Sequence, residues 1–160
     1  MIYHIIVALL KVDAVNDMKL LVLCTGNSCR SQMAEGFLKS FATELKIEIE
    51  VFSAGVQTDG LNPRAVIVMS EVGIDISKQT SDLVEKYLDT GITHLFSVCD
   101  HAKESCPVFP QSVNQIHHSF PDPAHAIGNE EEILNVFRST RDLIEKFCRQ
   151  LLLNLSKSQE

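Results

Sequence analysis

No stretch of the 160-residue sequence is apolar over the length that a membrane-spanning helix requires, so we expect no transmembrane segment. Positive charge is also scarce: 14 Lys and Arg stand against 21 Asp and Glu, which gives a net charge of -7. Proteins that bind nucleic acids are normally basic, and this balance therefore argues against a general nucleic-acid binder. A net negative charge is still compatible with a locally positive site for a small anion.

The N-terminal segment lacks the features of a secretory signal. Ile5 to Leu10 are apolar, but no Lys or Arg precedes them and no small-residue cleavage pattern follows. We interpret residues 1–17 as an N-terminal extension that is poorly ordered or not native, with Met18 as the native start, and residues 18–155 as one domain. Five cysteines, an odd number, do not fit a secreted disulfide framework. We therefore expect a cytoplasmic protein whose thiols are buried or reactive.

Apolar patterning alternates between strands and helices along the chain. Short apolar runs predict strands, whereas apolar residues at helical spacing predict helices. The predicted strands are Lys19–Cys24, Glu48–Ser53, Thr93–Val98 and Asn114–Phe120. The predicted helices are Arg30–Leu45, Pro63 to about Gly73, a short one that follows Thr80–Asp82 and runs to about Leu88, and Glu130–Leu153. This order predicts an α/β fold with a small four-stranded parallel sheet flanked by helices.

Three chemically functional residues follow predicted strands directly. Cys24 ends the first strand, Cys99 follows the third and Asp122 follows the fourth. In open parallel sheets, ligands bind outside the carboxyl ends of the strands. The sequence therefore predicts a site that contains these three residues.

The segment after the first strand has the composition of an oxyanion-binding loop. Neither the Walker pattern nor GxGxxG occurs in the chain, so other phosphate-binding loops fit poorly. A loop that enters a helix N-terminus directs backbone N–H groups at an anion, and Arg30 can add a bidentate clamp. The same groups favour the thiolate of Cys24, which predicts covalent attack on a tetrahedral oxyanion. The alternative is that Cys24 is only a buried thiol. The predicted anion-binding residues are Thr25, Gly26, Asn27, Ser28, Cys29, Arg30 and Ser31.

These residues carry a family resemblance. Cys24 to Gly36 (CTGNSCRSQMAEG) resembles the signature of thioredoxin-coupled arsenate reductases that share the low-molecular-weight protein tyrosine phosphatase fold. Later blocks occur in the same order, and they are Ser53–Gly55, Leu61–Pro63, Gly73–Ser77 and Gln79–Asp82. The resemblance extends from Met18 to the last helix and does not cover residues 1–17.

The resemblance implies reduction of arsenate to arsenite. Cys24 would attack arsenate, Cys99 would then attack Cys24 and release arsenite, and Cys106 would form the final disulfide with Cys99. Thioredoxin is the expected reductant of that disulfide, and phosphate or sulfate would compete for the anion site. The segment between Cys99 and Cys106 is charged and polar, and we expect it to be mobile.

Other interpretations of the downstream cysteines stay open. Cys99 and Cys106 are each compatible with an ordinary structural thiol. Together with His101 and His117 or His118 they would also make a zinc site, although the close ligand pairing usual in such sites is missing. Cys29 and Cys148 are expected to be structural apart from the place of Cys29 in the loop.

Two further expectations come from the resemblance. Asp122, followed by Pro123, would be the general acid that protonates a leaving oxygen, although an Asp-Pro pair by itself usually marks only a turn. Potassium is bound in some relatives by residues that correspond to Asn27, Glu35, Ser53 and Asp82. The simpler alternative is that Asn27 and Ser53 only brace the loop. No tightly bound cofactor is expected.

Two other functions compete with arsenate reduction. A low-molecular-weight protein tyrosine phosphatase would share the first loop and would not need Cys99 and Cys106. A non-catalytic oxyanion-binding protein would bind arsenate or phosphate without turnover. We expect a monomer without membrane or nucleic-acid partners.

Overall fold

A computed structural model describes residues 17–159, so the predicted N-terminal extension lies outside the described residues except for Asp17. The strands are β1 (Lys19–Cys24), β2 (Glu50–Gly55), β3 (His94–Ser97) and β4 (Asn114–His117). The helices are α2 (Arg30–Leu45), α3 (Pro63–Glu71), α4 (Asp100–Ser105) and α5 (Glu130–Lys157), with 3-10 turns η1 (Val84–Tyr87) and η2 (Pro123–His125).

The four strands form one parallel sheet in the order β2-β1-β3-β4. The predicted fold class is thereby confirmed. β1 lies in the interior of the sheet, and Leu20 to Leu23 are fully buried, which explains its unbroken apolar run. The register pairs Cys24 with Gly55 and Ser97 with His117, so the carboxyl ends of all strands lie at one edge.

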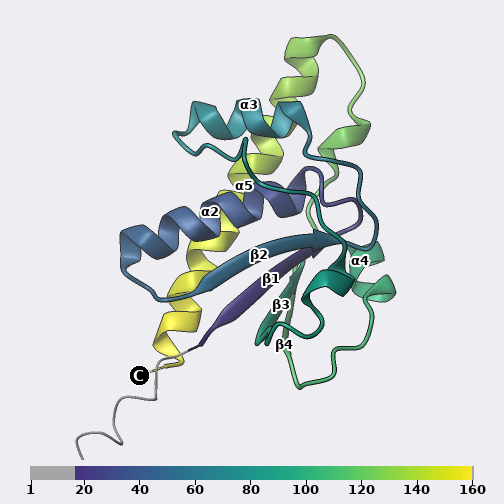
Figure 1. Ribbon diagram of the computed structural model, residues 1–160. Helices are drawn as coiled ribbons and strands as arrows, with labels where there is room; N and C mark the ends of the chain where they lie inside the picture. The colour runs from purple at the N-terminus through teal and green to yellow at the C-terminus, as the bar shows by residue number, and fades with distance from the viewer. Residues whose placement is uncertain (1–16, 160) are drawn as a thin grey trace, which may run out of the picture.

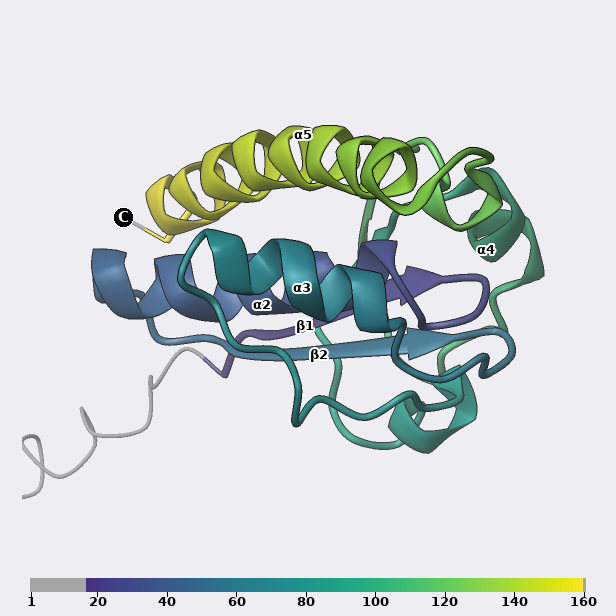
Figure 2. The same cartoon turned by 90° about the horizontal axis from the view of Figure 1, so that it is seen from above.

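Helices α2, α3 and α5 gather on one side of the sheet (Figures 1 and 2). Met33, Phe37 and Phe41 recur at helical spacing on α2 and are buried there, as the sequence pattern predicts. Phe147 of α5 stacks on Phe96 of β3 with ring centroids 5.2 Å apart. These contacts fix the N-terminal end of α2 next to the carboxyl end of β1.

Several predicted bounds differ from the structure. β2 begins and ends two residues later than predicted, β3 and β4 are shorter, and α5 continues to Lys157. The short helix expected near Leu88 is a 3-10 turn. Asp100–Ser105, which we expected to be a mobile connection, forms helix α4. Only Ala102 of α4 is buried, so this helix carries no apolar stripe by which the sequence could have revealed it.

Between residues 17 and 159, no helix combines the length and the apolar composition that crossing a bilayer requires.

Candidate active site

The loop Cys24–Cys29 connects the end of β1 to the start of α2. Asn27 has a φ of +47°, a left-handed conformation that asparagine tolerates, and it turns the chain back toward the helix. Gly26 has a different requirement. A Cβ placed on it would lie 2.0 Å from Oδ2 of Asp59, so a second segment packs directly on this residue. The loop therefore needs its small residue because of a neighbour that is distant in sequence.

That neighbour is the segment 56–62, which binds the outward carbonyl groups of the loop. Val56 N–H donates to Cys24 O at 3.2 Å and Gln57 N–H to Thr25 O at 2.9 Å. In the same way, Asp59 N–H donates to Gly26 O and Asn62 N–H to Ser28 O, at 2.8 and 3.1 Å. The carbonyl of Asn27 accepts from the Gln32 and Ser81 side chains, and that of Cys29 accepts from Met33 N–H in α2.

This bracing decides where the loop N–H groups point. The trans peptide is planar, so each N–H points opposite to the carbonyl of the preceding residue. Carbonyls directed at segment 56–62 therefore turn the following N–H groups away from it. Within residues 17–159, the N–H groups from Gly26 to Gln32 are not used in hydrogen bonds to protein atoms. Together with the N-terminus of α2 they supply the donors that an oxyanion needs.

The Cys24 thiol is held by a short relay. Its Sγ lies 2.9 Å from Oγ of Ser31, and that Oγ accepts a hydrogen bond from Nδ2 of Asn27 at 2.8 Å. Because the Ser31 oxygen is already an acceptor, its single proton is free to point at the sulfur. Cys24 is 3% exposed, so this donor faces it in a site largely free of competing water. The arrangement aims a hydrogen-bond donor at the sulfur that the sequence predicts to be the nucleophile.

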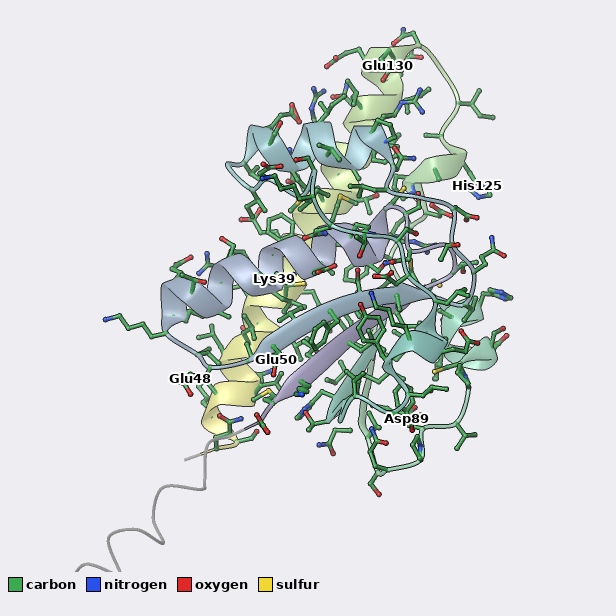
Figure 3. The ribbon with its side chains drawn as sticks, in the orientation of Figure 1. Lys39, Glu48, Glu50, Asp89, His125 and Glu130 are labelled. Carbon is green, nitrogen blue, oxygen red and sulfur yellow. The ribbon has the colours of Figure 1, made fainter. Side chains whose placement is uncertain are left out.

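Arg30 is fixed over the loop from the opposite side. Its Nη1 donates to the carbonyl of Phe120 at 3.0 Å, and its Nη2 lies 3.4 Å from Oδ2 of Asp122. The same carboxylate oxygen is 3.4 Å from Nε2 of His125, which lies at the strand-end edge of the molecule (Figure 3). Asp122 Oδ1 accepts from Ala124 N–H and so caps η2. The structure thus brings Asp122 to Arg30, where a proton donor for a leaving oxygen would be needed.

Cys24, Arg30 and Asp122 open into one cavity of about 520 Å³. Polar side chains dominate its wall, and no Phe or Tyr ring among the described residues lines it. The other lining residues are Thr25, Gly26, Ser28, Cys29, Gln57, Asp59, Asn62, His101, Ala124 and His125. The cavity therefore suits a small hydrated anion better than an aryl group.

Cys99 reaches the loop through Thr25. Its Sγ lies 3.3 Å from Oγ1 of Thr25, and the residue is buried at the start of α4. Cys106 lies at the other end of α4 and lines a different cavity, where its Sγ contacts the Pro107 carbonyl at 3.4 Å. The structure places Cys99 beside the nucleophile loop, but it does not bring Cys106 there.

Burial raises the pKa of the other three thiols, which are those of Cys29, Cys106 and Cys148. It raises the pKa of Cys29 to about 12, despite a weak hydrogen bond to Ser28, and Cys29 therefore stays a thiol at neutral pH. Burial also raises the pKa of Cys148, which packs inside the core. Both results fit the structural roles predicted for these residues. Burial, and secondarily the charge of Glu85, raises the pKa of Cys106 as well.

The zinc alternative does not fit the structure. His101 faces the anion cavity, whereas Cys106 and His117 line the other cavity. From residue 17 to 159, no three His, Cys, Asp or Glu side chains are grouped so that they could hold a metal ion. His118 stacks on Phe147 with centroids 4.5 Å apart and has a packing role.

The four residues of the potassium hypothesis form a network beside the loop. Asn27 Nδ2 donates to Ser53 Oγ at 2.9 Å, Ser53 Oγ donates to Glu35 Oε2 at 2.5 Å, and the Asp82 N–H donates to Asn27 Oδ1 at 2.8 Å. Lysines already pair with the two carboxylates. Lys39 lies 2.6 Å from Glu35, and Lys86 lies 3.2 Å from Asp82. The network braces the loop as it stands, and potassium binding stays a prediction.

Two groups of residues escaped the sequence analysis. Segment 56–62 acts through its backbone N–H groups, which leave no side-chain signature, although Asp59 and Gly60 mark a turn. His117, which the sequence suggested only as a possible zinc ligand, instead joins Ser97 and Asp100 by hydrogen bonds of 2.7 and 2.8 Å.

Replacing Arg30 by lysine should lower kcat/KM by about 100- to 1000-fold, the effect usual for loss of one preorganised oxyanion donor. Lysine keeps the charge but loses the planar fork and cannot hold Phe120 O and an anion at once. Steady-state kinetics would measure this, with exposed Arg64→Lys as the matched control. Equal kcat/KM values for Arg30→Lys and Arg64→Lys would contradict a role of Arg30 in binding the oxyanion.

The sequence profile described as low molecular weight phosphotyrosine protein phosphatase matches residues 19–160. This chain belongs to that family. The match includes the nucleophile loop, Cys99, Cys106 and Asp122, and it confirms the family resemblance inferred from the loop and the later blocks.

Curated relatives within this similarity carry the name arsenate reductase. The protein of Halalkalibacterium halodurans is 48% identical over 124 residues, which cover 78% of this chain and 87% of that protein. The protein of Bacillus subtilis is 48% identical over 122 residues, which cover 76% of this chain and 86% of that protein.

Solved structures with this fold include both enzyme classes. An arsenate reductase in the phosphate-binding state is 33% identical, with a TM-score of 0.66 and coverage of 86% of this chain and 98% of that chain. The YwlE arginine phosphatase, as a mutant with a phosphorylated active-site serine, is 25% identical with a TM-score of 0.75, and the match covers 88% of this chain and 97% of that chain. Because the backbone fold is common to both classes, residues outside the anion loop must distinguish them.

Proposed function

We propose that this chain reduces arsenate to arsenite by a cascade through Cys24, Cys99 and Cys106. The observation that carries the proposal is the position of a second buried thiol, Cys99, against Thr25 of the nucleophile loop. Reduction needs two electrons, and two thiols that become one disulfide supply them. Phosphate ester hydrolysis needs no second thiol. The curated relatives named arsenate reductase support the same activity.

In the first step the Cys24 thiolate attacks arsenic. A sulfur–arsenic bond forms, and one arsenate oxygen leaves as water after protonation. The N–H groups of the loop and Arg30 would hold the remaining oxygens, and Asp122, whose carboxylate lies 3.4 Å from Arg30, would supply the proton.

In the second step Cys99 attacks the sulfur of Cys24. A Cys24–Cys99 disulfide forms, the sulfur–arsenic bond breaks, and its electron pair stays on arsenic, which leaves as arsenite. The Thr25 hydroxyl lies 3.3 Å from the Cys99 sulfur and can donate a hydrogen bond to it, which holds this sulfur beside the nucleophile loop.

In the third step the Cys106 thiolate attacks Cys99 and releases Cys24. The two cysteines cap opposite ends of α4, so seven residues at helical rise place their Cα atoms about 10 Å apart. A disulfide tolerates Cα separations of only about 4–7 Å. Helix α4 must therefore unwind before this bond can form, although the structure shows it folded.

The burial and the raised pKa of Cys106 fit an order in which α4 unwinds before this thiol reacts. While it is half-buried, its raised pKa keeps it protonated and unreactive. Unwinding of α4 would expose the thiol and return its pKa toward the ordinary value. The third thiol would then become a nucleophile only after the helix has opened.

A protein tyrosine phosphatase is the second candidate, because Asp122 beside Arg30 would also serve ester hydrolysis. The wall of the anion cavity argues against it. A phosphotyrosine ring would meet Gln57, Asp59, His101 and His125, none of which offers the large apolar face on which an aryl ring stacks well.

The deciding measurement follows NADPH oxidation with purified protein, arsenate, thioredoxin and thioredoxin reductase. We expect sustained, arsenate-dependent oxidation, with competitive inhibition by phosphate or sulfate. Hydrolysis of an aryl phosphate is measured in parallel. Aryl phosphate turnover without any NADPH oxidation would favour the phosphatase, and tight arsenate binding without either reaction would favour an oxyanion-binding protein.

The reductant is part of the proposal. Thioredoxin is the expected donor to the Cys99–Cys106 disulfide, and its replacement by glutathione and glutaredoxin in the same assay would test this choice. A monomer in the cytoplasm remains the expected context.

A further inference from the structure

Helix α4 has little that holds it to the rest of the protein. It is only six residues long, too short for a helix to be stable by itself in water. Ala102 is its single buried residue. The exposed residues of the helix are Asp100, His101, Lys103, Glu104 and Ser105.

One side-chain hydrogen bond joins α4 to another element among residues 17–159. Nε2 of His117 lies 2.8 Å from Oδ1 of Asp100, the first residue of the helix. Nδ1 of the same ring lies 2.7 Å from Oγ of Ser97. Ser97 and His117 are register partners in β3 and β4, so the sheet holds the imidazole rigidly on its second nitrogen.

The chain Ser97–His117–Asp100 can persist in either protonation state of the histidine. A neutral ring can donate from Nε2 to Asp100 and accept the Ser97 hydroxyl proton at Nδ1. A protonated ring donates at both nitrogens, and Ser97 then accepts, because its hydroxyl can rotate. The sheet therefore fixes the imidazole side of this contact, although the Asp100 carboxylate is exposed, whereas an ordinary exposed ion pair joins two mobile side chains and contributes little.

We propose that Asp100, His117 and Ser97 form a latch that keeps α4 folded and so limits how fast Cys106 reaches Cys99. This inference rests on the proposed cascade. The latched residue is adjacent to Cys99, so release of Asp100 frees the end of α4 that carries the thiol under attack. In that step Cys106 forms a bond to Cys99, the Cys24–Cys99 bond breaks, and Cys24 leaves as thiolate.

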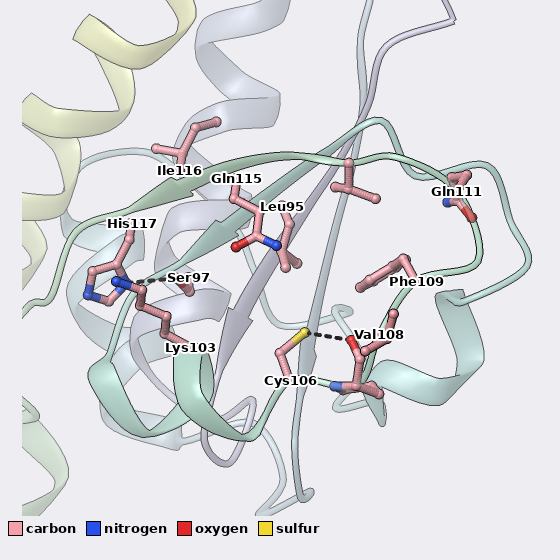
Figure 4. A pocket seen from close by; sticks show the side chains of 12 residues that line it. Leu95, Ser97, Lys103, Cys106, Val108, Phe109, Gln111, Gln115, Ile116 and His117 are labelled. Carbon is pink, nitrogen blue, oxygen red and sulfur yellow. Dashed lines mark hydrogen bonds between the residues drawn. The ribbon is translucent and has the colours of Figure 1, made fainter.

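The second cavity gives the opening helix space. Ser97 and His117 line it together with Lys103 and Cys106, and its volume is about 510 Å³ (Figure 4). It lies beside β3 and β4, on the side of α4 where Cys106 is held by the Pro107 carbonyl. Two members of the latch, Ser97 and His117, therefore face the same cavity as the thiol that must move. His117 and Ser97 act as positioning residues, since neither lines the anion cavity.

The test compares Asp100→Ala with Glu104→Gln. Glu104 lies on the same helix and makes no hydrogen bond or ion pair within the described residues, so its replacement removes a similar charge without touching the latch. After one arsenate turnover, acid quenching and peptide mass spectrometry give the rate of Cys99–Cys106 disulfide formation. We expect it to rise about fivefold in Asp100→Ala, as loss of one modest hydrogen bond allows, and to stay unchanged in Glu104→Gln.

A second readout does not depend on arsenate. Alkylation of buried Cys99 by N-ethylmaleimide, followed by peptide mapping, reports how often α4 opens. Asp100→Ala and Ser97→Ala should accelerate it, Asp100→Asn should be intermediate because its amide oxygen still accepts a hydrogen bond, and Glu104→Gln should match the wild type. If the variants and the wild type share one midpoint of global unfolding, the faster alkylation reports local opening of α4 alone.

The two readouts separate the latch from the cascade. Faster alkylation in a protein that never reduces arsenate would retain the latch and reject the proposed function. Arsenate turnover with both rates equal in Asp100→Ala and Glu104→Gln would retain the function and overturn the latch.

Discussion

Replacing Cys99 by serine should abolish sustained arsenate reduction, measured as NADPH oxidation with the thioredoxin system. Serine is close in size and keeps a hydroxyl within reach of Thr25, so the loop should remain in place. It cannot attack the Cys24 sulfur to form a disulfide, and the two electrons then have no route from Cys24 to arsenic. We expect loss to the background of the assay, because among residues 17–159 only the thiol of Cys99 makes a hydrogen-bond contact with Thr25 of the loop.

Alkylation supplies the control for this variant. Iodoacetate should still modify Cys24 of Cys99→Ser, and phosphate should still protect it, because the anion donors come from the loop and Arg30. The matched substitution Cys148→Ser concerns a core thiol remote from the cascade and should leave turnover in place if the variant folds. Turnover in Cys99→Ser at the wild-type rate would rule out Cys99 as the second thiol.

Replacing Cys106 by serine should allow one turnover and no more. Cys24 and Cys99 remain, so arsenite is released once and a Cys24–Cys99 disulfide accumulates. Peptide mapping under non-reducing conditions should find this linkage in stoichiometric amount after exposure to arsenate. The NADPH assay should show no steady state, since the trapped disulfide joins two residues that are both buried in the structure.

Two samples serve as controls for Cys106→Ser, the same variant without arsenate and the wild type with arsenate but without reductant. Without arsenate, the same variant should contain no such linkage, because Cys24 and Cys99 are free thiols. Wild type treated with arsenate but no reductant should instead hold a Cys99–Cys106 disulfide. A missing Cys24–Cys99 linkage in the variant, despite arsenite release, would contradict the order of the cascade.

Sequence reasoning was most successful where a local pattern maps directly onto a buried element. The run Lys19–Cys24 is apolar on both faces because β1 lies in the interior of the sheet, and the stripe through Met33 and Phe37 is the buried side of α2. The nucleophile loop was also evident, because a strand, a turn and a helix follow one another without interruption. Its donors are backbone groups whose direction depends on that order.

The same reasoning missed the helical state of α4. The segment Asp100–Ser105 has a polar composition typical of a mobile connection, and a single alanine carries its packing. Its helical state depends on partners from β3 and β4, which are supplied only when those strands pair. Intrinsic propensity is a weak guide for a helix this short, and tertiary contacts decide it.

The sequence by itself determined the fold class, the family and the position of the loop between β1 and α2. Each of these follows from local order along the chain. Only the tertiary structure decided that segment 56–62 binds the loop carbonyls, that Cys99 contacts the loop while Cys106 does not, and that His117 reaches Asp100 of α4. The reason is physical: these are contacts between residues far apart in sequence, which the parallel sheet brings to one edge.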